Sequence, residues 1–168
     1  FDGTLAHADA LWSRGLYGAL RLYAPHCRAG YDDVRNLTRT GFPWHDPGGD
    51  YASWVGEAWW ARMEELFLRQ YARLGVKGEA ARRCAAFVRR TVAQGRAYCL
   101  YADTLSTLEA FRAAGCRQHL LSNHCPELPH ICRRLGLEGY LDTCTVSALE
   151  GYDKPRRELF EIALRRAG

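Results

Sequence analysis

Two short apolar strands alternate with helices in the second half of this chain, and this alternation constrains the fold more than any other feature. The strands are predicted over Gln118–Ser122 and Thr143–Ser147. Residues with helical spacing precede the first strand, lie between the two and follow the second. Strands that alternate with helices form a parallel sheet with right-handed crossovers. The predicted fold class is therefore α/β, with a parallel sheet.

Three helices are expected around these strands, each with one apolar face. The first ends at Gly115, the second begins at Pro126 and ends at Gly136, and the third covers Arg156–Arg166. The apolar faces are formed by Leu105, Leu108 and Phe111 in the first helix, by Leu128, Ile131, Cys132 and Leu135 in the second, and by Phe160, Ala163 and Leu164 in the third.

A helical section without strands precedes this alternating part. Its apolar periodicity predicts long helices over residues 10–23, 51–74 and 77–93, and a shorter one over 31–38. Pro43, Pro47 and a pair of glycines interrupt the segment between the short helix and the next long one, so turns are expected there. There are no internal repeats and no low-complexity segments.

Aromatic side chains are concentrated in this helical section. Trp54, Trp59 and Trp60 invite a ligand-binding interpretation, but aromatic residues at helical spacing more often pack in a core or between helices. Trp44 and His45 lie in the interrupted segment and need not be buried. The structural interpretation is favoured for these as well.

Composition narrows the class of protein. The 168 residues are 48% apolar and 25% charged, as in a soluble globular domain. The net charge of +4 comes from arginine pairs on helices, and no nucleic-acid-binding module accompanies them, so no nucleic-acid partner is expected. No apolar run approaches the roughly 18 residues of a membrane span, so no membrane partner is expected either.

The seven cysteines suggest neither a disulfide framework nor a structural zinc site, because their number is odd and no Cys-x-x-Cys pair occurs. Cys84 and Cys132 fall on apolar helix faces and are expected in the core. This usage is typical of a reducing compartment, and we expect a cytoplasmic protein.

Three polar clusters stand where catalytic groups of a parallel sheet are found. They are Asp2-Gly3-Thr4 after a possible opening strand, Ser122-Asn123-His124 after the first predicted strand, and Lys154-Pro155 after the second. In open parallel sheets, ligands bind at the carboxyl ends of the strands. Each cluster also has an ordinary alternative, namely a turn, a helix cap and a surface loop, so their order and spacing carry the argument.

In that order the clusters resemble the motifs of the haloacid dehalogenase-like hydrolases. Asp2-Gly3-Thr4-Leu5 resembles the end of the first motif, Asp-x-Asp-Gly-Thr-Leu. The run Leu120–Asn123 is similar to the second motif, and Val146–Pro155 to the third. The resemblance covers residues 1–5 and about 100–168. It implies a Rossmann-like α/β core from residues 1–9 and 97–168, and an inserted helical cap of the C1 type from residues 10–96.

The same alignment implies that the family's nucleophilic aspartate would precede Phe1 and that a fourth, metal-binding motif would follow Gly168. We therefore expect residues 1–168 to be a fragment of a longer protein, inactive on its own and with an exposed sheet edge. Phosphatase activity from these residues alone would contradict this register.

The resemblance assigns the proton chemistry to Asp2. As the second carboxylate of the first motif, it would protonate the leaving alcohol and then take a proton from the water that hydrolyses an aspartyl-phosphate. The expected cofactor is Mg²⁺, which suits a site made of oxygen ligands. In the family its ligands include the backbone carbonyl at the position of Asp2.

The other matched residues would bind the phosphoryl group. Lys154 would neutralise its negative charge, which otherwise repels an attacking anion. The Ser122 hydroxyl and the backbone amides of Gly3 and Asn123 would donate hydrogen bonds, and Thr4 belongs to the same loop. Gly3 allows the backbone to approach the substrate closely.

An aspartate at position 2 favours a phosphatase of a small phosphorylated metabolite, because a departing halide needs no proton. The alternatives are a 2-haloacid dehalogenase, a phosphonate hydrolase and a catalytically silent binding protein of the same fold. A phosphonate hydrolase would bring a lysine from the cap, where Lys77 is the only one. His124 and His45 could face the substrate or be structural.

Overall fold

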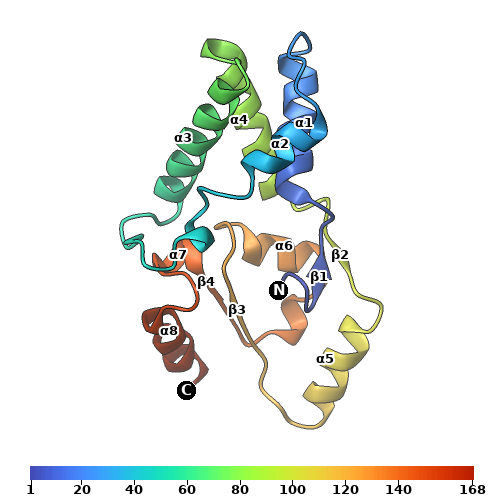
Figure 1. Cartoon of the computed structure of the whole chain (residues 1–168). Helices are drawn as coiled ribbons and strands as arrows, with labels where there is room; N and C mark the ends of the chain where they lie inside the picture. Colours follow the sequence, from blue (N-terminus) through green and yellow to red (C-terminus); the bar gives the residue numbers. More distant parts are fainter.

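The computed structural model describes all 168 residues. In chain order the elements are β1 (Ala6–His7), α1 (Leu11–Tyr23), α2 (Tyr31–Leu37), the 3-10 helix η1 (Pro43–His45), α3 (Glu57–Arg73), α4 (Gly78–Ala93), β2 (Cys99–Leu100), α5 (Thr104–Ala113), β3 (His119–Ser122), α6 (Leu128–Arg134), the 3-10 helix η2 (Glu138–Tyr140), β4 (Thr143–Val146), α7 (Ser147–Glu150) and α8 (Arg157–Ala167). Helices α1–α4 gather at one end, and the strands with α5–α8 at the other (Figure 1).

Packing of α1 and α3 against α4 builds the helical end of the molecule. Leu16 and Leu20 of α1 and Val88 and Val92 of α4 are buried, as their spacing predicted. Full burial of one such side chain contributes about 1.5–3 kcal/mol. Cys84 is also buried here, as predicted. We call α1–α4 and their connections the cap; the exact residue boundaries of the cap stay a prediction.

Helix α3 begins at Glu57, and the prediction of a helix from Tyr51 was wrong at that end. Gly56 precedes it with φ of 56°, a conformation that cannot continue a helix. Residues 51–54 form a turn closed by the bond from the Trp54 N–H to the Tyr51 carbonyl, at 2.7 Å. Trp59 and Trp60 are buried, which confirms their structural interpretation.

The predicted parallel sheet is present and consists of β3 and β4, with His119 opposite Thr143 and Ser122 opposite Val146. The other edge of β3 pairs with no strand. A second ribbon, β1 with β2, is antiparallel and was not predicted, because two residues per strand carry no periodic signal. The predicted second strand ends one residue early, since Ser147 begins α7.

The helices around the sheet bury less than their sequence predicted. Helix α6 begins at Leu128 rather than Pro126 and buries Leu128, Ile131 and Cys132 of its predicted face, while Leu135 lies just beyond the helix and is half-buried. Of the predicted apolar face of α5 only Leu108 is buried, while Phe111 is 53% exposed. In α8 the buried residue is Leu159, and Leu164 is 70% exposed. The prediction was wrong for these two faces because a sheet of two strands offers too little surface to cover them.

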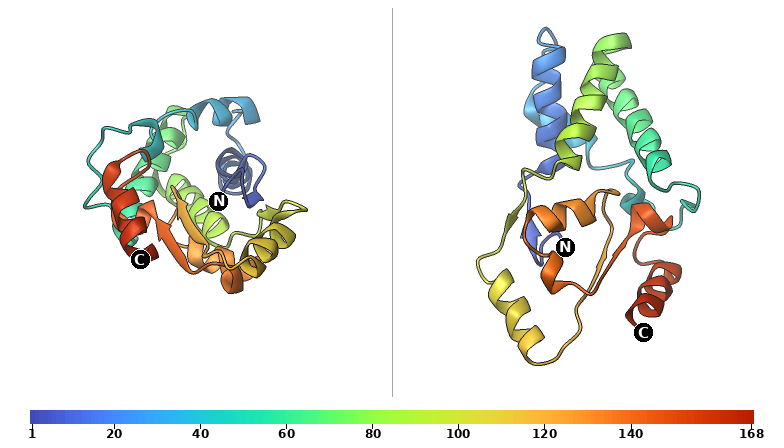
Figure 2. Two further views of the ribbon diagram at one scale, coloured as in Figure 1. Left: turned by 90° about the horizontal axis from the view of Figure 1, so that it is seen from below. Right: turned by 180° about the vertical axis from the view of Figure 1, so that it is seen from behind.

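Two chain crossings join the cap to the rest of the molecule, one before α1 and one after α4, and the views of Figure 2 agree on this arrangement. Side-chain bonds add to these crossings. The Trp60 indole N–H of α3 donates to both carboxylate oxygens of Glu127, at 2.9 and 3.0 Å. The Arg156 guanidinium donates to the Gly49 carbonyl, at 2.9 Å. Judged by length and hydropathy, no helix of this fold qualifies as a membrane span.

Candidate functional site

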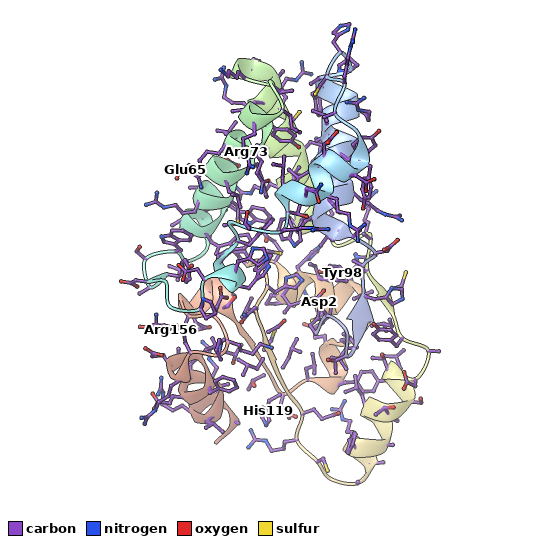
Figure 3. The ribbon with its side chains drawn as sticks, in the orientation of Figure 1. Asp2, Glu65, Arg73, Tyr98, His119 and Arg156 are labelled. Atoms are coloured by element: carbon purple, nitrogen blue, oxygen red, sulfur yellow. The ribbon has the colours of Figure 1, made fainter.

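A cavity of about 410 Å³ lies where the cap meets the strands. Asp2, Tyr98, Asn123 and His124 line it from the strand side, and aromatic residues of the cap line it from the other side. Asp2 and Tyr98 lie close together below the cap helices (Figure 3). Two of the three polar clusters predicted from the sequence therefore reach one cavity.

A tight turn presents Asp2. The N–H groups of Thr4 and Leu5 donate to the Phe1 carbonyl, at 3.1 and 2.9 Å, and the Gly3 N–H donates to the Ala6 carbonyl, at 3.0 Å. Gly3 has φ of 72°, so a side chain here would strain the turn. The Gly3 amide is occupied in this structure, and its predicted bond to phosphate stays a prediction.

His124 and Tyr98 stand directly behind the carboxylate. The His124 Nε2 lies 3.9 Å from Asp2 Oδ2 and 2.9 Å from the Tyr98 hydroxyl. Burial lowers the pKa of His124, although the nearby Asp2 charge opposes this effect. The imidazole is therefore neutral at neutral pH, and its contact with Asp2 is not an ion pair.

Neutral His124 allows two assignments of hydrogen bonds. With the ring proton on Nδ1, that N–H faces the Cys125 carbonyl at 3.4 Å and Nε2 accepts from the Tyr98 hydroxyl at 2.9 Å. With the ring proton on Nε2, Nδ1 becomes an acceptor. The Cys125 sulfur lies 3.3 Å from His124 Nδ1 and can donate its S–H there. The Nε2–H then donates to the Tyr98 oxygen, and the Tyr98 hydroxyl is left to donate to Asp2. Burial and the Asp2 charge both raise the pKa of Tyr98, so this hydroxyl keeps its proton. In this second assignment the chain of donors ends on the Asp2 carboxylate.

Asn123 joins the second and third clusters. Its side-chain oxygen accepts from the Lys154 N–H at 2.7 Å, and its amide nitrogen donates to the Lys154 carbonyl at 3.1 Å. The Lys154 ammonium donates to the Leu121 carbonyl at 3.3 Å, at the end of β3. Lys154 and Thr4 line a neighbouring cavity of about 530 Å³.

Ser122 is buried at the end of β3 and lines neither of these two cavities. Its hydroxyl makes one long contact, 3.5 Å to the Asn123 carbonyl. The structure thus brings Asp2 and Asn123 to one cavity and links Asn123 to Lys154, with Ser122 beside them. The catalytic and binding roles of Asp2, Gly3, Thr4, Ser122, Asn123 and Lys154 stay predictions.

A second network, absent from the predictions, supports the same loop. The His124 N–H donates to the Ser147 hydroxyl oxygen at 3.2 Å. Ser147 in turn donates to Asp153. Burial raises the pKa of the Asp153 carboxyl, although the Ser147 hydrogen bond and the Lys154 charge oppose this effect. Sequence reasoning also missed Tyr98, Trp12 and Phe42. These residues carry no local motif, and only the tertiary fold brings them to the site.

A model of the haloacid dehalogenase-like hydrolase family matches residues 1–168 of this chain. The chain belongs to this family. The resemblance drawn from its motifs is thereby confirmed, as is the α/β Rossmann-like fold with a helical cap. A search of curated proteins found no match.

Solved structures of the same fold include two hydrolases of this family. A HAD phosphatase from Thermococcus onnurineus matches with a TM-score of 0.61 and 16% identity over 100% of this chain and 69% of its own. L-2-haloacid dehalogenase from Xanthobacter autotrophicus matches with a TM-score of 0.60 and 15% identity over 98% and 61%. Protein Tyrosine Kinase A of Mycobacterium tuberculosis matches with a TM-score of 0.52 and 19% identity over 100% and 67%. The chain spans between 61% and 69% of these proteins, and the likeness concerns the fold alone.

Proposed function

We propose that this HAD-like hydrolase is a phosphatase that cleaves the phosphate monoester of a small molecule through an aspartyl-phosphate intermediate. One observation carries the proposal: the Asp2 carboxylate faces a cavity and contacts a neutral hydrogen-bonding pair, Tyr98 and His124. A carboxylate in this setting can exchange protons with a leaving alcohol and with water. Such general acid–base help is worth about 10²–10⁴-fold in rate.

Asp2, Asn123 and Lys154 then have defined tasks. In this family the nucleophile is the first carboxylate of the Asp-x-Asp motif, at the position that aligns two before Asp2. Lys154, held by the two Asn123 bonds, neutralises charge on the phosphoryl oxygens as the nucleophile approaches. Asp2 gives a proton to the leaving oxygen, so the alcohol departs neutral, and later takes a proton from the attacking water.

The donor atoms of Asp2 suit Mg²⁺ in kind, because this hard cation prefers carboxylate and carbonyl oxygens. Asp2 is the only carboxylate that lines the cavity, and the chain has no group of three His, Cys, Asp or Glu side chains that could hold a metal. We propose that Asp2 supplies one ligand of a Mg²⁺ site through its backbone carbonyl. The bound ion would supply positive charge beside the phosphoryl oxygens.

Among the alternatives, a phosphonate hydrolase that uses Lys77 receives no support. Lys77 lies at the start of α4, at the end of the cap far from the strands, and lines a different cavity together with Tyr23 and Leu74 (Figure 1). A dehalogenase would share the fold but would have no use for a proton donor at position 2.

The test is phosphate release by the protein as its complete gene encodes it, with Mg²⁺ and a panel of phosphate monoesters. We expect Asp2→Asn to lower kcat about 10²–10⁴-fold. Asp9→Asn is the matched control, because Asp9 pairs with Arg14 on the surface of the same opening segment. Turnover of 2-chloropropionate without any phosphatase activity would show a dehalogenase. A folded protein that turns over neither substrate would support the silent binding protein.

A further inference from the structure

The cap side of the Asp2 cavity is aromatic. Trp12 comes from the start of α1, and Phe42 and Trp44 from the segment around η1. The Phe42 and Trp44 rings are stacked with centroids 4.5 Å apart, and the Trp12 ring lies 5.1 Å from that of Phe42 and 6.0 Å from that of Trp44. We call these three residues the aromatic wall. Phe42 is buried in the core, whereas Trp12 and Trp44 are only partly buried and therefore offer the ring surface that a ligand in the cavity could contact.

No lysine or arginine lines this cavity. Its one imidazole, His124, is buried, and its Nε2 is engaged with the Tyr98 hydroxyl at 2.9 Å. Arg14, on the first turns of α1, points to the surface and pairs with Asp9 at 2.5 Å. A second phosphate or a carboxylate on the substrate would therefore leave water for a cavity whose only charged group is Asp2, of the same sign. Burying such an unpaired charge is costly.

The polar side chains of the cap wall are already engaged. The Ser13 hydroxyl lies 3.2 Å from the Ala10 carbonyl and 3.0 Å from the Tyr31 hydroxyl. The Thr38 hydroxyl donates to the Arg35 carbonyl at 2.8 Å. A leaving group rich in hydroxyls, such as a sugar, would find few donors and acceptors on this side.

We propose that the leaving group of the substrate is an uncharged, flat, ring-bearing alcohol, which packs against Trp12 and Trp44 of the aromatic wall. Its phosphate would lie beside Asp2 and Asn123, on the side of the neighbouring cavity that Lys154 lines. This inference rests on the proposed phosphatase function and adds the substrate class. The volume of about 410 Å³ is near the lower end of the roughly 300–1,000 Å³ of small-molecule sites, so the cavity suits a small, one-ring or two-ring alcohol. Contact with an aromatic ring adds about 0.5–1.5 kcal/mol beyond area burial.

Binding to the 168-residue chain tests the wall without need of turnover. The probes for isothermal titration calorimetry are phenyl phosphate, glycerol 2-phosphate, 3-phosphoglycerate and phenol. We expect phenyl phosphate to bind about tenfold or more tightly than both other esters, as aromatic contact and area burial together imply. Trp44→Leu should weaken phenyl phosphate and phenol about threefold to tenfold and leave glycerol 2-phosphate unchanged.

Trp54→Leu is the matched control, because Trp54 lies in the same connection but packs on Tyr51 and Arg62, away from the cavity. Should Trp44→Leu fail to fold, Thr38→Arg serves instead. This substitution adds a cation to the cap side of the cavity, and the affinity for 3-phosphoglycerate should then rise relative to that for phenyl phosphate. The inference would be overturned if phenyl phosphate bound no more tightly than 3-phosphoglycerate. It would also be overturned if Trp44→Leu left the affinity for phenol unchanged.

The proposed function and this inference fail separately. Phenol that binds in a manner sensitive to Trp44→Leu, together with a complete protein that releases no phosphate from any ester, would refute the phosphatase and leave a site for ring-bearing alcohols. Phosphatase activity that prefers sugar phosphates or phosphorylated acids would refute the substrate class and keep the phosphatase.

Discussion

Single residues at this site act through their neighbours. Asp2 is 51% exposed in its side chain, while His124 behind it is buried and neutral. The backbone of His124 is held by Ser147, which also bonds Asp153. Asp153 precedes Lys154, whose backbone is held by Asn123. Two segments far apart in the sequence, 123–124 and 147–154, are thus tied together at the ends of β3 and β4 by side-chain hydrogen bonds.

Asp153 gives this network a pH dependence. Burial raises the pKa of its carboxyl, so the folded state holds the proton more strongly than the unfolded chain does. Its contribution to stability is complete below the unfolded pKa of about 3.9 and is lost as pH rises through the higher folded value. Between pH 4 and pH 7 we expect the wild type to lose free energy of unfolding relative to Asp153→Asn, as measured by urea denaturation.

Asp142→Asn is the control with a pKa shift of the opposite sign. The Gln118 N–H donates to Asp142 at 2.6 Å and lowers the pKa of its carboxyl. This contribution is present above the unfolded pKa of about 3.9 and is lost as pH falls below it. The free energy of unfolding of the wild type relative to Asp142→Asn should therefore stay nearly constant between pH 4 and pH 7 and fall only below about pH 4. A difference in free energy of unfolding between wild type and Asp153→Asn that stays constant with pH would contradict the raised pKa of Asp153.

At the scale of elements, the sequence predicted what is periodic or bounded by glycine. Helices α1 and α4 begin within one residue of their predicted positions, because apolar residues recur along one face and glycine or proline follows or precedes them. The two-residue strands β1 and β2 have no such pattern. The exposed faces of α5 and α8 depend on the width of the sheet, which no local pattern states.

The same limit applies to the site. Asp2, Asn123 and Lys154 were found because each belongs to a motif with a characteristic spacing. Tyr98 and His124 are separated by 26 positions and meet only through the fold. The aromatic wall combines Trp12 at the start of a helix with Phe42 and Trp44 of an irregular segment. No sequence pattern links the three residues, and aromatic residues of this kind usually pack in a core. The motifs predicted the family and a set of candidate residues, whose chemical roles stay predictions, whereas the shape and charge of the cavity required the structure.

Gly18 and Gly95 differ in backbone conformation and in the space around them, so alanine at the two positions should have opposite effects on stability. Gly18 lies inside α1 with ordinary helical φ, and a methyl group there would meet no atom within 4 Å. Gly18→Ala should stabilise the protein by about 0.5–1 kcal/mol, because glycine loses more backbone entropy on folding. Gly95, after α4, has φ of 61°, and a methyl group there would lie 2.6 Å from Ile131.

Gly95→Ala should therefore destabilise the protein by more than about 1 kcal/mol, from both strain and overpacking. Urea denaturation of the two variants beside the wild type measures both effects. Equal effects of the two substitutions would mean that the end of α4 is not held against α6 in the way described.

At the scale of the whole molecule, the position of the cap over the cavity depends on a few bonds between distant segments. Trp60 of α3 is fully buried and donates to Glu127, which directly precedes α6. The Gly56 N–H donates to the Ala148 carbonyl of α7 at 2.9 Å. Because Glu127 follows the His124–Cys125 segment closely, the same loop that lines the cavity also holds the cap.

Trp60→Phe removes the indole donor while keeping an aromatic ring in the core. The Glu127 carboxylate then loses its partner, and we expect a loss of about 1–3 kcal/mol in the free energy of unfolding. Glu127→Gln keeps an oxygen that accepts the Trp60 N–H, so its cost should be smaller. Urea denaturation of both variants measures this, and Glu127→Gln as costly as Trp60→Phe would show that charge rather than the hydrogen bond holds the contact. Because this bond crosses from cap to strands, Trp60→Phe should also speed limited proteolysis at the cap connections, which a purely local packing defect inside α3 would not do.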